Sequence, residues 1–179
     1  IREGSIRKER RFVVVDCTTL PPALVENDLF GHEQGAYTDA RQRRQGRLEH
    51  AHKGTLFLDE IGDLPRDFQP KFLRALEGGS FMRVGGNEEV HSDFRVIAAT
   101  NRNLWEMVEK GLFREDLFYR LNVYPITIPP LRDRKDDIVP LVEHFLDLTS
   151  KDSVVLSEES KAMLEAYSWP GNVRELRNV

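Results

Sequence analysis

The sequence has almost no cysteine and no long apolar run. Cys17 is the single cysteine among 179 residues, which excludes an intramolecular disulfide and a cysteine-based metal cluster and is typical of a reducing compartment. No apolar stretch approaches the roughly 18 residues that a membrane helix needs. The charged start, IREGSIRKERR, also lacks the pattern of a signal peptide. These absences predict a cytoplasmic protein with no membrane partner.

An excess of positive charge is also missing. Lys and Arg number 26 against 30 Asp and Glu, a net charge of -4, which argues against a broadly basic nucleic-acid-binding surface while allowing local basic patches. Hydrophobic residues make up 40% of the chain and charged residues 31%, as in an ordinary globular protein. The length suits one domain and part of a second.

Apolar runs alternate with helical patterns along most of the chain. The spacing predicts a parallel, helix-covered sheet of the α/β class, with a hairpin turning at Gly85–Asn87. From about residue 135 the pattern is entirely helical, and Ser157 suits the N-cap of one of these helices. We therefore predict an α/β subdomain over 1–135 and a helical subdomain over 136–179. The expected strands cover 11–17, 55–59, 94–101 and 123–130.

Polar residues follow two of the predicted strands at the point where each one ends. Asp59 and Glu60 follow one strand, and Thr100 and Asn101 end another. Ligands of open parallel sheets bind beyond the carboxyl ends of the strands, where one carboxylate can hold magnesium through water and its neighbour can orient a water against a phosphate. The alternatives are an acidic turn and an Asn cap. The pattern favours a nucleotide site.

An ordered set of motifs extends this interpretation to a family. The motifs LFGHEQGAYTDA, GTLFLDEIGDLP, RVGG, VIAATN, FREDLFYRLNVYPITIPPLRDR and WPGNVREL together resemble the AAA+ ATPase domain of bacterial enhancer-binding proteins. These nitrogen-regulator-type proteins activate sigma-54 RNA polymerase. The resemblance implies ATP and Mg²⁺ as cofactors, with Asp59 as the water-mediated magnesium ligand and Glu60 as the catalytic carboxylate. Thr100 and Asn101 would form sensor I.

The same resemblance gives roles to three arginines. Arg114 and Arg120 would be arginine fingers that reach the γ-phosphate in a neighbouring subunit, which implies a ring, typically a hexamer. Without the family, both would be interpreted as surface arginines among acids. Arg174 would be the nucleotide-contacting sensor II of the lid, or otherwise an ordinary arginine on a helix surface.

The stretch GAYTDA occupies the position of the family's GAFTGA loop, which contacts sigma-54. A ring and a hydroxyl on an adaptable backbone suit a protein contact, although a turn with Thr38 capping the following helix is the structural alternative. Tyr37 replaces Phe and keeps the ring, whereas Asp39 replaces Gly and adds a charge. The expected partner loop consists of Gly35, Ala36, Tyr37, Thr38, Asp39 and Ala40.

Asp16 is a second departure from the family pattern, which commonly has Asn there to hold the catalytic Glu. An Asp cannot donate a hydrogen bond to Glu60 unless one carboxyl is protonated, and two close carboxylates raise the pKa of one of them. We therefore expect altered coupling between hydrolysis and loop movement.

The phosphate-binding pattern G-x-x-x-x-G-K-[ST] is absent, since Gly4 is followed by SIRKERR. In the family this loop and its strand lie just upstream of the position of residue 1. We therefore expect the chain to be a fragment that binds ATP poorly by itself, within a parent that contacts DNA mainly through another domain.

Three functions are compatible with these observations. The first is an ATP-hydrolysing motor that remodels the closed promoter complex of the sigma-54 RNA polymerase holoenzyme. The second, favoured by Asp16 and Asp39, is a non-hydrolysing AAA+-like regulatory or assembly module with another protein partner. The third is a AAA+ ATPase with a different client, such as a helicase loader, for which LFGHEQGAYTDA is not expected.

Overall fold

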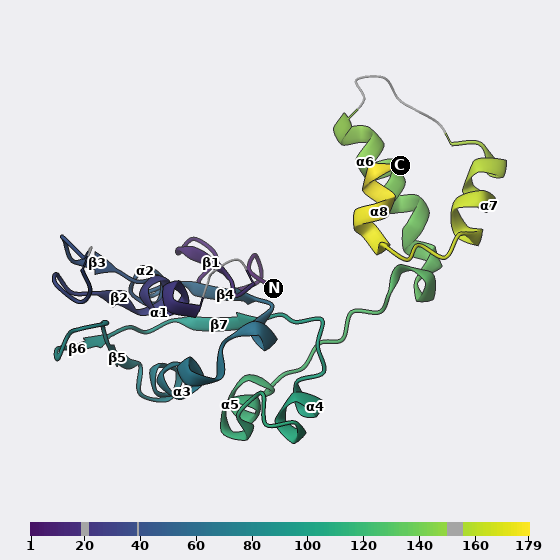
Figure 1. Cartoon of the computed structure of the whole chain (residues 1–179). Coiled ribbons are helices and arrows are strands. Elements are labelled where there is room, and N and C mark those ends of the chain that lie inside the picture. Colours follow the sequence, from purple (N-terminus) through teal and green to yellow (C-terminus); the bar gives the residue numbers. More distant parts are fainter. Residues whose placement is uncertain (19–21, 39, 150–155) are drawn as a thin grey trace. The chain divides into compact units, whose positions relative to one another are not determined.

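The computed structural model describes residues 1–18, 22–38, 40–149 and 156–179. The chain divides into two compact units, Ile1–Tyr124 and Pro125–Val179 (Figure 1). Within the described residues, no helix is both long and apolar enough to cross a membrane.

The first unit is built of short strands and helices. Its strands are β1 (Phe12–Asp16), β2 (Gly31–His32), β3 (Arg44–Gln45), β4 (Thr55–Asp59), β5 (Ser80–Met82), β6 (Glu89–His91) and β7 (Arg95–Ala98). Its helices are α1 (Pro22–Phe30), α2 (Arg47–His50), α3 (Gln69–Gly78), α4 (Leu104–Glu109) and α5 (Glu115–Leu121), with 3-10 turns at Ile61–Asp63 and Arg66–Phe68.

The sheet of the first unit is parallel, with the order β1-β4-β7 in the described residues. The runs FVVVD and TLFLD supply the β-branched and apolar side chains that a covered parallel sheet requires. The register aligns Asp16 with Asp59 on the neighbouring strand. Since all three strands run the same way, their carboxyl ends share one edge of the sheet.

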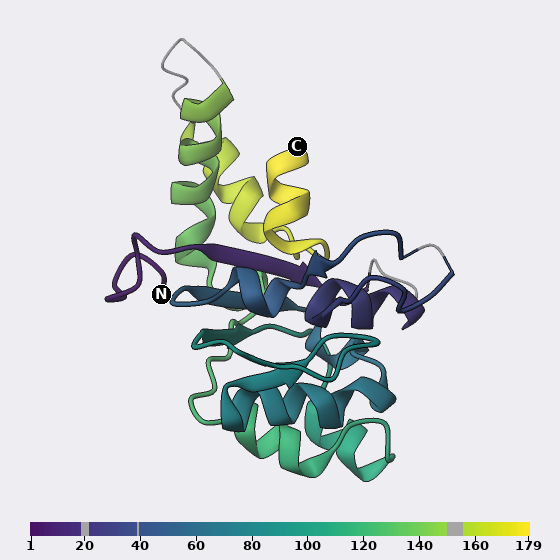
Figure 2. The same ribbon diagram turned by 90° about the vertical axis from the view of Figure 1, so that its left-hand side faces the viewer.

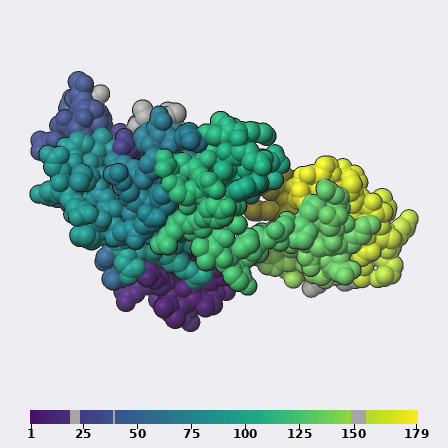
Figure 3. Space-filling view, turned by 90° about the horizontal axis from the view of Figure 1, so that it is seen from below, coloured from purple at the N-terminus to yellow at the C-terminus, as the bar shows by residue number. Residues whose placement is uncertain are grey.

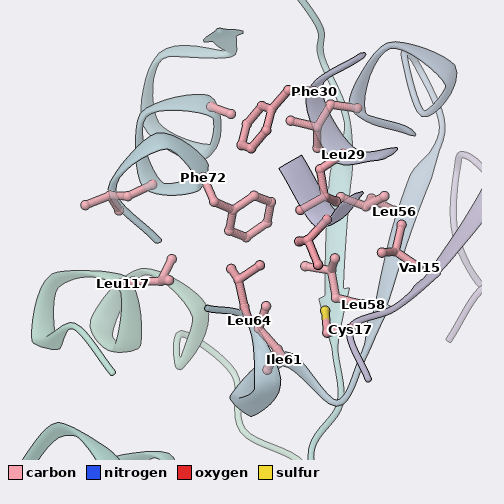
Figure 4. Packing of buried hydrophobic residues seen from close by; sticks show 14 of the residues in the cluster. Val15, Cys17, Leu29, Phe30, Leu56, Leu58, Ile61, Leu64, Phe72 and Leu117 are labelled. Carbon is pink, nitrogen blue, oxygen red and sulfur yellow. The ribbon is translucent and has the colours of Figure 1, made fainter. Parts of the chain in front are cut away.

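The core of the first unit packs helices against the central strand. Phe30 of α1, Phe72 of α3 and Leu117 of α5 are fully buried together with Leu56 and Leu58 of β4 (Figure 4). Each such side chain contributes about 1.5–3 kcal/mol of transfer free energy. Helices α3 and α5 lie side by side in both Figure 1 and Figure 2. This packing fixes the central strand and the acidic residues that follow it.

The second unit is helical and has its own core. Ser157 accepts a hydrogen bond from the Ser160 N–H, which confirms the predicted N-cap. The side chain of Asn172 accepts a hydrogen bond from the Leu131 N–H at 2.7 Å. The buried core residues are Leu131, Ile138, Trp169 and Leu176. Its elements are 3-10 turns at Leu131–Asp133 and Lys135–Asp137 and the helices α6 (Ile138–Thr149), α7 (Glu158–Ala166) and α8 (Asn172–Asn178).

The predicted parallel α/β class and the hairpin are confirmed, because β5 and β6 pair antiparallel on either side of the glycine turn. The strand predicted at 123–130 is wrong, since these residues have no regular structure. Val123 and Tyr124 are 76% and 84% exposed, and no described strand pairs with them. The composition suits a strand, but three prolines remove N–H donors from the stretch and a strand requires a partner.

Candidate functional site

The candidate site starts at the end of β4, where Asp59 and Glu60 leave the sheet. Both side chains are half-buried, and neither forms an ion pair with any residue that the structure describes. The Asp59 carbonyl accepts a hydrogen bond from the Cys17 N–H at 3.0 Å, which fixes the chain direction at the strand end. The two carboxylates therefore remain available for a cation or a polar ligand.

Glu60 has a left-handed backbone, with φ 52° and ψ 51°. This conformation is uncommon for a glutamate and costs on the order of 1–3 kcal/mol. Its carboxylate Oε2 accepts a hydrogen bond from the Asn101 N–H at 3.0 Å, so the end of β4 is tied to the residues after β7. The structure thus brings Glu60 and Asn101 together, as the sequence predicts, and holds Glu60 in a strained backbone.

Thr100 lies on the β7 side of the candidate site. Its hydroxyl oxygen accepts a hydrogen bond from the Arg102 N–H at 3.1 Å, and Arg102 forms an ion pair with Asp63. A Cβ at Gly62 would lie 3.1 Å from the Thr100 hydroxyl oxygen, so the turn after Glu60 approaches Thr100 closely. This packing orders both strand ends.

Asp16 lies beside Asp59 and makes local hydrogen bonds. Its Oδ1 accepts from the Thr18 N–H at 2.8 Å and from the Thr18 hydroxyl at 2.6 Å.

The buried Cys17 follows Asp16, and burial together with the charges of the surrounding acids raises the pKa of its thiol to about 12. The sulfur of Cys17 lies beside Leu58 and Ile61 (Figure 4). The acids that raise this pKa are Asp16, Asp63, Asp59 and Glu60. Three acids, Asp16, Asp59 and Glu60, therefore lie at the carboxyl ends of β1 and β4.

A metal ion would need additional ligands here. Among the described residues, no group of three or more His, Cys, Asp or Glu side chains is arranged to hold a metal ion.

Both predicted finger arginines contact groups of their own unit. Arg114 pairs with Asp116 at 2.7 Å, which raises the pKa of Arg114 and lowers the pKa of Asp116 from their ordinary values. Arg120 donates to the Leu76 carbonyl at 2.9 Å. Both arginines stay accessible, because the Arg114 side chain is 39% exposed and Arg120 is exposed.

Gln69 supports Arg114 and was not found from the sequence. It is fully buried, its amide donates to the Leu64 carbonyl at 2.9 Å, and its carbonyl accepts from the Arg114 N–H at 2.8 Å. A polar residue at the start of a helix gives no sequence signal for a partner 45 residues away.

Backbone hydrogen bonds join the described residues of the expected partner loop. The Gly35 N–H donates to the Ala40 carbonyl at 2.8 Å, and the Ala40 N–H to the Tyr37 carbonyl at 2.9 Å. Tyr37 is 43% exposed and rests edge-on against the buried His32. Thr38 is exposed but caps no helix, since α2 begins later, after Gly46. Asp39 lies outside the described residues.

A buried arginine fixes the base of this loop and was also missed from the sequence. Arg83 is 5% exposed; it binds Glu49 of α2 through both carboxylate oxygens, at 2.8 and 2.7 Å, and Glu33 at 2.7 Å. These bonds raise its pKa above the ordinary value. A Cβ at Gly85 would lie only 2.7 Å from the Ala36 Cβ, so the hairpin turn packs directly on the loop. The motif RVGG is the only sequence signal for this contact.

Arg174 is exposed on α8, in the second unit. No described residue forms an ion pair with it, which leaves its guanidinium accessible to solvent.

The chain has a parallel sheet in which β1 and β4 end in carboxylates, and a separate helical unit follows it; solved AAA+ proteins share this α/β fold class. The chain belongs to the Sigma-54 interaction domain family, whose model matches residues 1–127. The model of the AAA+ ATPase lid domain matches residues 132–179. The family resemblance found in the sequence is confirmed.

Curated relatives and solved structures agree with this assignment. Over 172 residues the chain is 54% identical to the nitrogen fixation protein VnfA of Azotobacter vinelandii, covering 94% of this chain and 33% of VnfA. It is 50% identical to the regulatory protein AtoC of Escherichia coli, covering all of this chain and 40% of AtoC. A crystal structure of NtrX from Brucella abortus in complex with ATP matches with a TM-score of 0.85 and 42% identity, covering 99% of this chain and 41% of that one. The chain thus spans about two fifths or less of these relatives' lengths.

Proposed function

We propose that this chain is the ATP-hydrolysing motor domain of a sigma-54-dependent transcriptional activator, which remodels the closed promoter complex through the loop at 35–40. One observation carries the proposal: Glu60, in a strained backbone, is bonded to the Asn101 N–H beside an Asp59 that has no ion pair with a described residue. Strain of this kind is concentrated at functional sites. Membership of the Sigma-54 interaction domain family supports the partner.

Each site residue has a defined role in this proposal. Asp59 would hold Mg²⁺ through water, and the ion would supply positive charge against the phosphate oxygens. Glu60 orients the attacking water and accepts its proton. The Asn101 N–H keeps the Glu60 carboxylate turned toward the end of β7. Thr100 and the Asn101 side chain act as sensor I. The ATP complex of NtrX, at 42% identity, supports ATP as the nucleotide.

The proposal needs a phosphate-binding loop that residues 1–18 do not supply. We place the strand that leads into this loop beside β7, because the outer edge of β7 is unpaired within the described residues. A strand there would pair the free edge of β7.

We further propose a ring, in this family a hexamer. Arg114 and Arg120 would exchange Asp116 and the Leu76 carbonyl for the γ-phosphate bound to a neighbouring subunit. Gln69 would preserve the position of Arg114 during this exchange. We propose that residues 1–135 form the α/β subdomain and that residues 136–179 form a lid subdomain. Arg174, in the lid, would report the nucleotide state. DNA would be contacted mainly by another domain, and the protein would act in the cytoplasm.

The partner loop gives a direct test of the proposed function. We expect Tyr37→Ala to lower the capture of sigma-54 by the full-length protein, in a trapped nucleotide state, at least about tenfold, as for a buried interface tyrosine. Tyr37→Phe keeps the ring and should bind like the wild type. Asp39→Gly restores the Gly that the family has at this position and removes a charge, so its capture of sigma-54 is compared with that of the wild type. If neither the wild type nor Asp39→Gly binds sigma-54, the client is a different protein.

Replacing Asp16 tests the expected coupling between ATP hydrolysis and movement of the partner loop. Asn at this position would add an N–H donor and remove a negative charge next to Asp59, so we expect Asp16→Asn to change the basal ATPase rate and its stimulation by sigma-54 by about two- to tenfold, since ~1.4 kcal/mol corresponds to a factor of ten. A steady-state ATPase assay on the full-length protein measures both quantities. Equal rates and equal stimulation in the two proteins would contradict the expected role.

A non-hydrolysing regulatory or assembly module is the second candidate function. The position of Asp16 against Asp59 favours it, because added negative charge at this edge opposes the approach of a triphosphate. Hydrolysis that depends on Glu60 excludes this second function.

A further inference from the structure

The residues that follow the partner loop form an exposed basic segment. Residues 41–45, with the sequence RQRRQ, are exposed at every position and end in the short strand β3. The blue part of the chain that contains them lies on the outside of the unit (Figure 3). The segment contains no acidic and no apolar side chain, and it follows directly on the turn that closes at Ala40.

The nearby acids leave much of this positive charge uncompensated. Arg43 and Arg44 reach Glu33 and Asp28 only at 3.8 Å, and their side chains are 51% and 67% exposed. Both acids have closer partners: Arg83 binds Glu33 at 2.7 Å, and Arg47 binds Asp28 at 3.0 Å. Exposed pairs at such long distances contribute little.

Arg41 adds a further cation to the segment. No described residue forms an ion pair with it. Three guanidinium groups within four positions thus face solvent beside the partner loop. A solvated face normally mixes charges of both signs. The segment itself carries only positive charge, although the whole chain has a net charge of -4, and the two acids next to it have closer partners.

The composition distinguishes between the possible partners. Hot spots of protein interfaces are enriched in Trp, Tyr and Arg and lie in well-packed, desolvated pockets, whereas RQRRQ supplies exposed Arg without any aromatic or apolar anchor. Phosphate contacts require only charge and N–H donors, which Arg and Gln both supply. Arginine also binds phosphate through two parallel hydrogen bonds. The observations therefore favour a nucleic-acid backbone over an acidic protein.

We propose that the basic segment, residues 41–45, binds the phosphate backbone of nucleic acid without regard to sequence. This goes beyond the proposed motor function, and it depends neither on ATP hydrolysis nor on sigma-54 binding. In a ring, several copies of the segment would bind one nucleic acid at the same time, so contacts that are weak individually would together raise the overall affinity. The loop and the basic segment would then contact a protein and the adjacent nucleic acid together.

The test compares the full-length wild type with the double variant Arg41→Gln/Arg43→Gln. Arg44 is kept, because it lies in β3 and its loss could disturb the pairing with β2. Binding to a random-sequence DNA duplex without a promoter is measured by fluorescence anisotropy over a range of salt concentrations. Each phosphate contact contributes about 0.9 to the slope of log affinity against log salt. We expect the variant to bind more weakly at low salt, with a slope smaller by about 1.8 for each subunit engaged. The wild type's advantage should therefore shrink roughly tenfold between about 50 and 200 mM salt.

The matched control is Arg74→Gln/Arg95→Gln, which removes the same charge from exposed positions on α3 and β7. We expect this control to keep the wild-type slope. An equal loss in the control, or an unchanged slope in the segment variant, would overturn the proposal. Loss of binding to polyglutamate without loss of DNA binding would also overturn it, in favour of an acidic protein partner. ATPase activity and sigma-54 capture, measured on the same preparations, report separately on the proposed motor function.

Discussion

Replacing Glu60 with Gln is expected to lower the ATPase rate of the full-length protein by about a hundredfold to ten-thousandfold, the range for loss of a general base. The amide keeps the size of the side chain but cannot accept a proton from water. The Asn101 N–H can still bond to the amide oxygen, so the local structure is retained. Nucleotide affinity should change by no more than about threefold, because the phosphates are held by other groups.

The experiment needs both a rate and a binding measurement. Release of inorganic phosphate gives the rate, and titration with a fluorescent ATP analogue gives the affinity. Glu77→Gln is the matched control: it is an exposed glutamate of α3, and its replacement should leave both quantities unchanged. Hydrolysis that survives in Glu60→Gln would remove Glu60 from the catalytic role. Absence of hydrolysis in the wild type as well would favour the non-hydrolysing module.

Replacing Arg83 with Met is expected to destabilise the base of the partner loop by about 3–5 kcal/mol, because loss of one partner leaves the others as uncompensated buried charge. Arg83 is 5% exposed, and the side chain of its main partner, Glu49, is 9% exposed. The two glutamates would repel each other, and the hairpin would lose its bonds to α2 and to Glu33. We also expect the partner loop to lose its fixed position.

Hydrogen exchange followed by mass spectrometry, as a function of urea, measures this stability in the full-length protein. Peptides covering 80–91 and 47–58 should show the lowered stability as faster hydrogen exchange at a given urea concentration. The double variant Arg83→Met/Glu49→Met removes both members of the main pair, so it should recover part of the stability. Arg95→Met, at an exposed arginine of β7, should cost less than about 0.5 kcal/mol. A similar small cost for Arg83→Met would contradict the structural role of the buried charges.

Much of the α/β unit follows from local sequence patterns. The runs FVVVD and TLFLD are apolar and β-branched, so β1 and β4 are predictable from composition. Parallel order then places Asp59 and Glu60 beside Thr100 and Asn101 without any knowledge of side-chain contacts. The stretch at 123–130 has the same kind of composition and yet forms no strand, because pairing depends on a neighbour that local sequence does not specify.

The missed features all depend on distant contacts. The left-handed backbone of Glu60 results from the turn that brings the chain past Thr100, and nothing in the sequence LDEIG requires it. Arg83 finds Glu33 and Glu49 at separations of 50 and 34 residues. Such ion networks leave no periodic signal, so only the fold reveals them. The close pair of Arg114 with Asp116, by contrast, is visible in the sequence FRED.

The position of a bound nucleotide decides whether the acidic edge of the sheet is a motor site. A crystal structure of the full-length protein with Mg²⁺ and a non-hydrolysable ATP analogue determines it. We predict that Asp59 will face the water shell of the metal and that Glu60 will face the terminal phosphate. A nucleotide bound elsewhere, or Asp59 and Glu60 turned into ion pairs with their own chain, would contradict the proposed function.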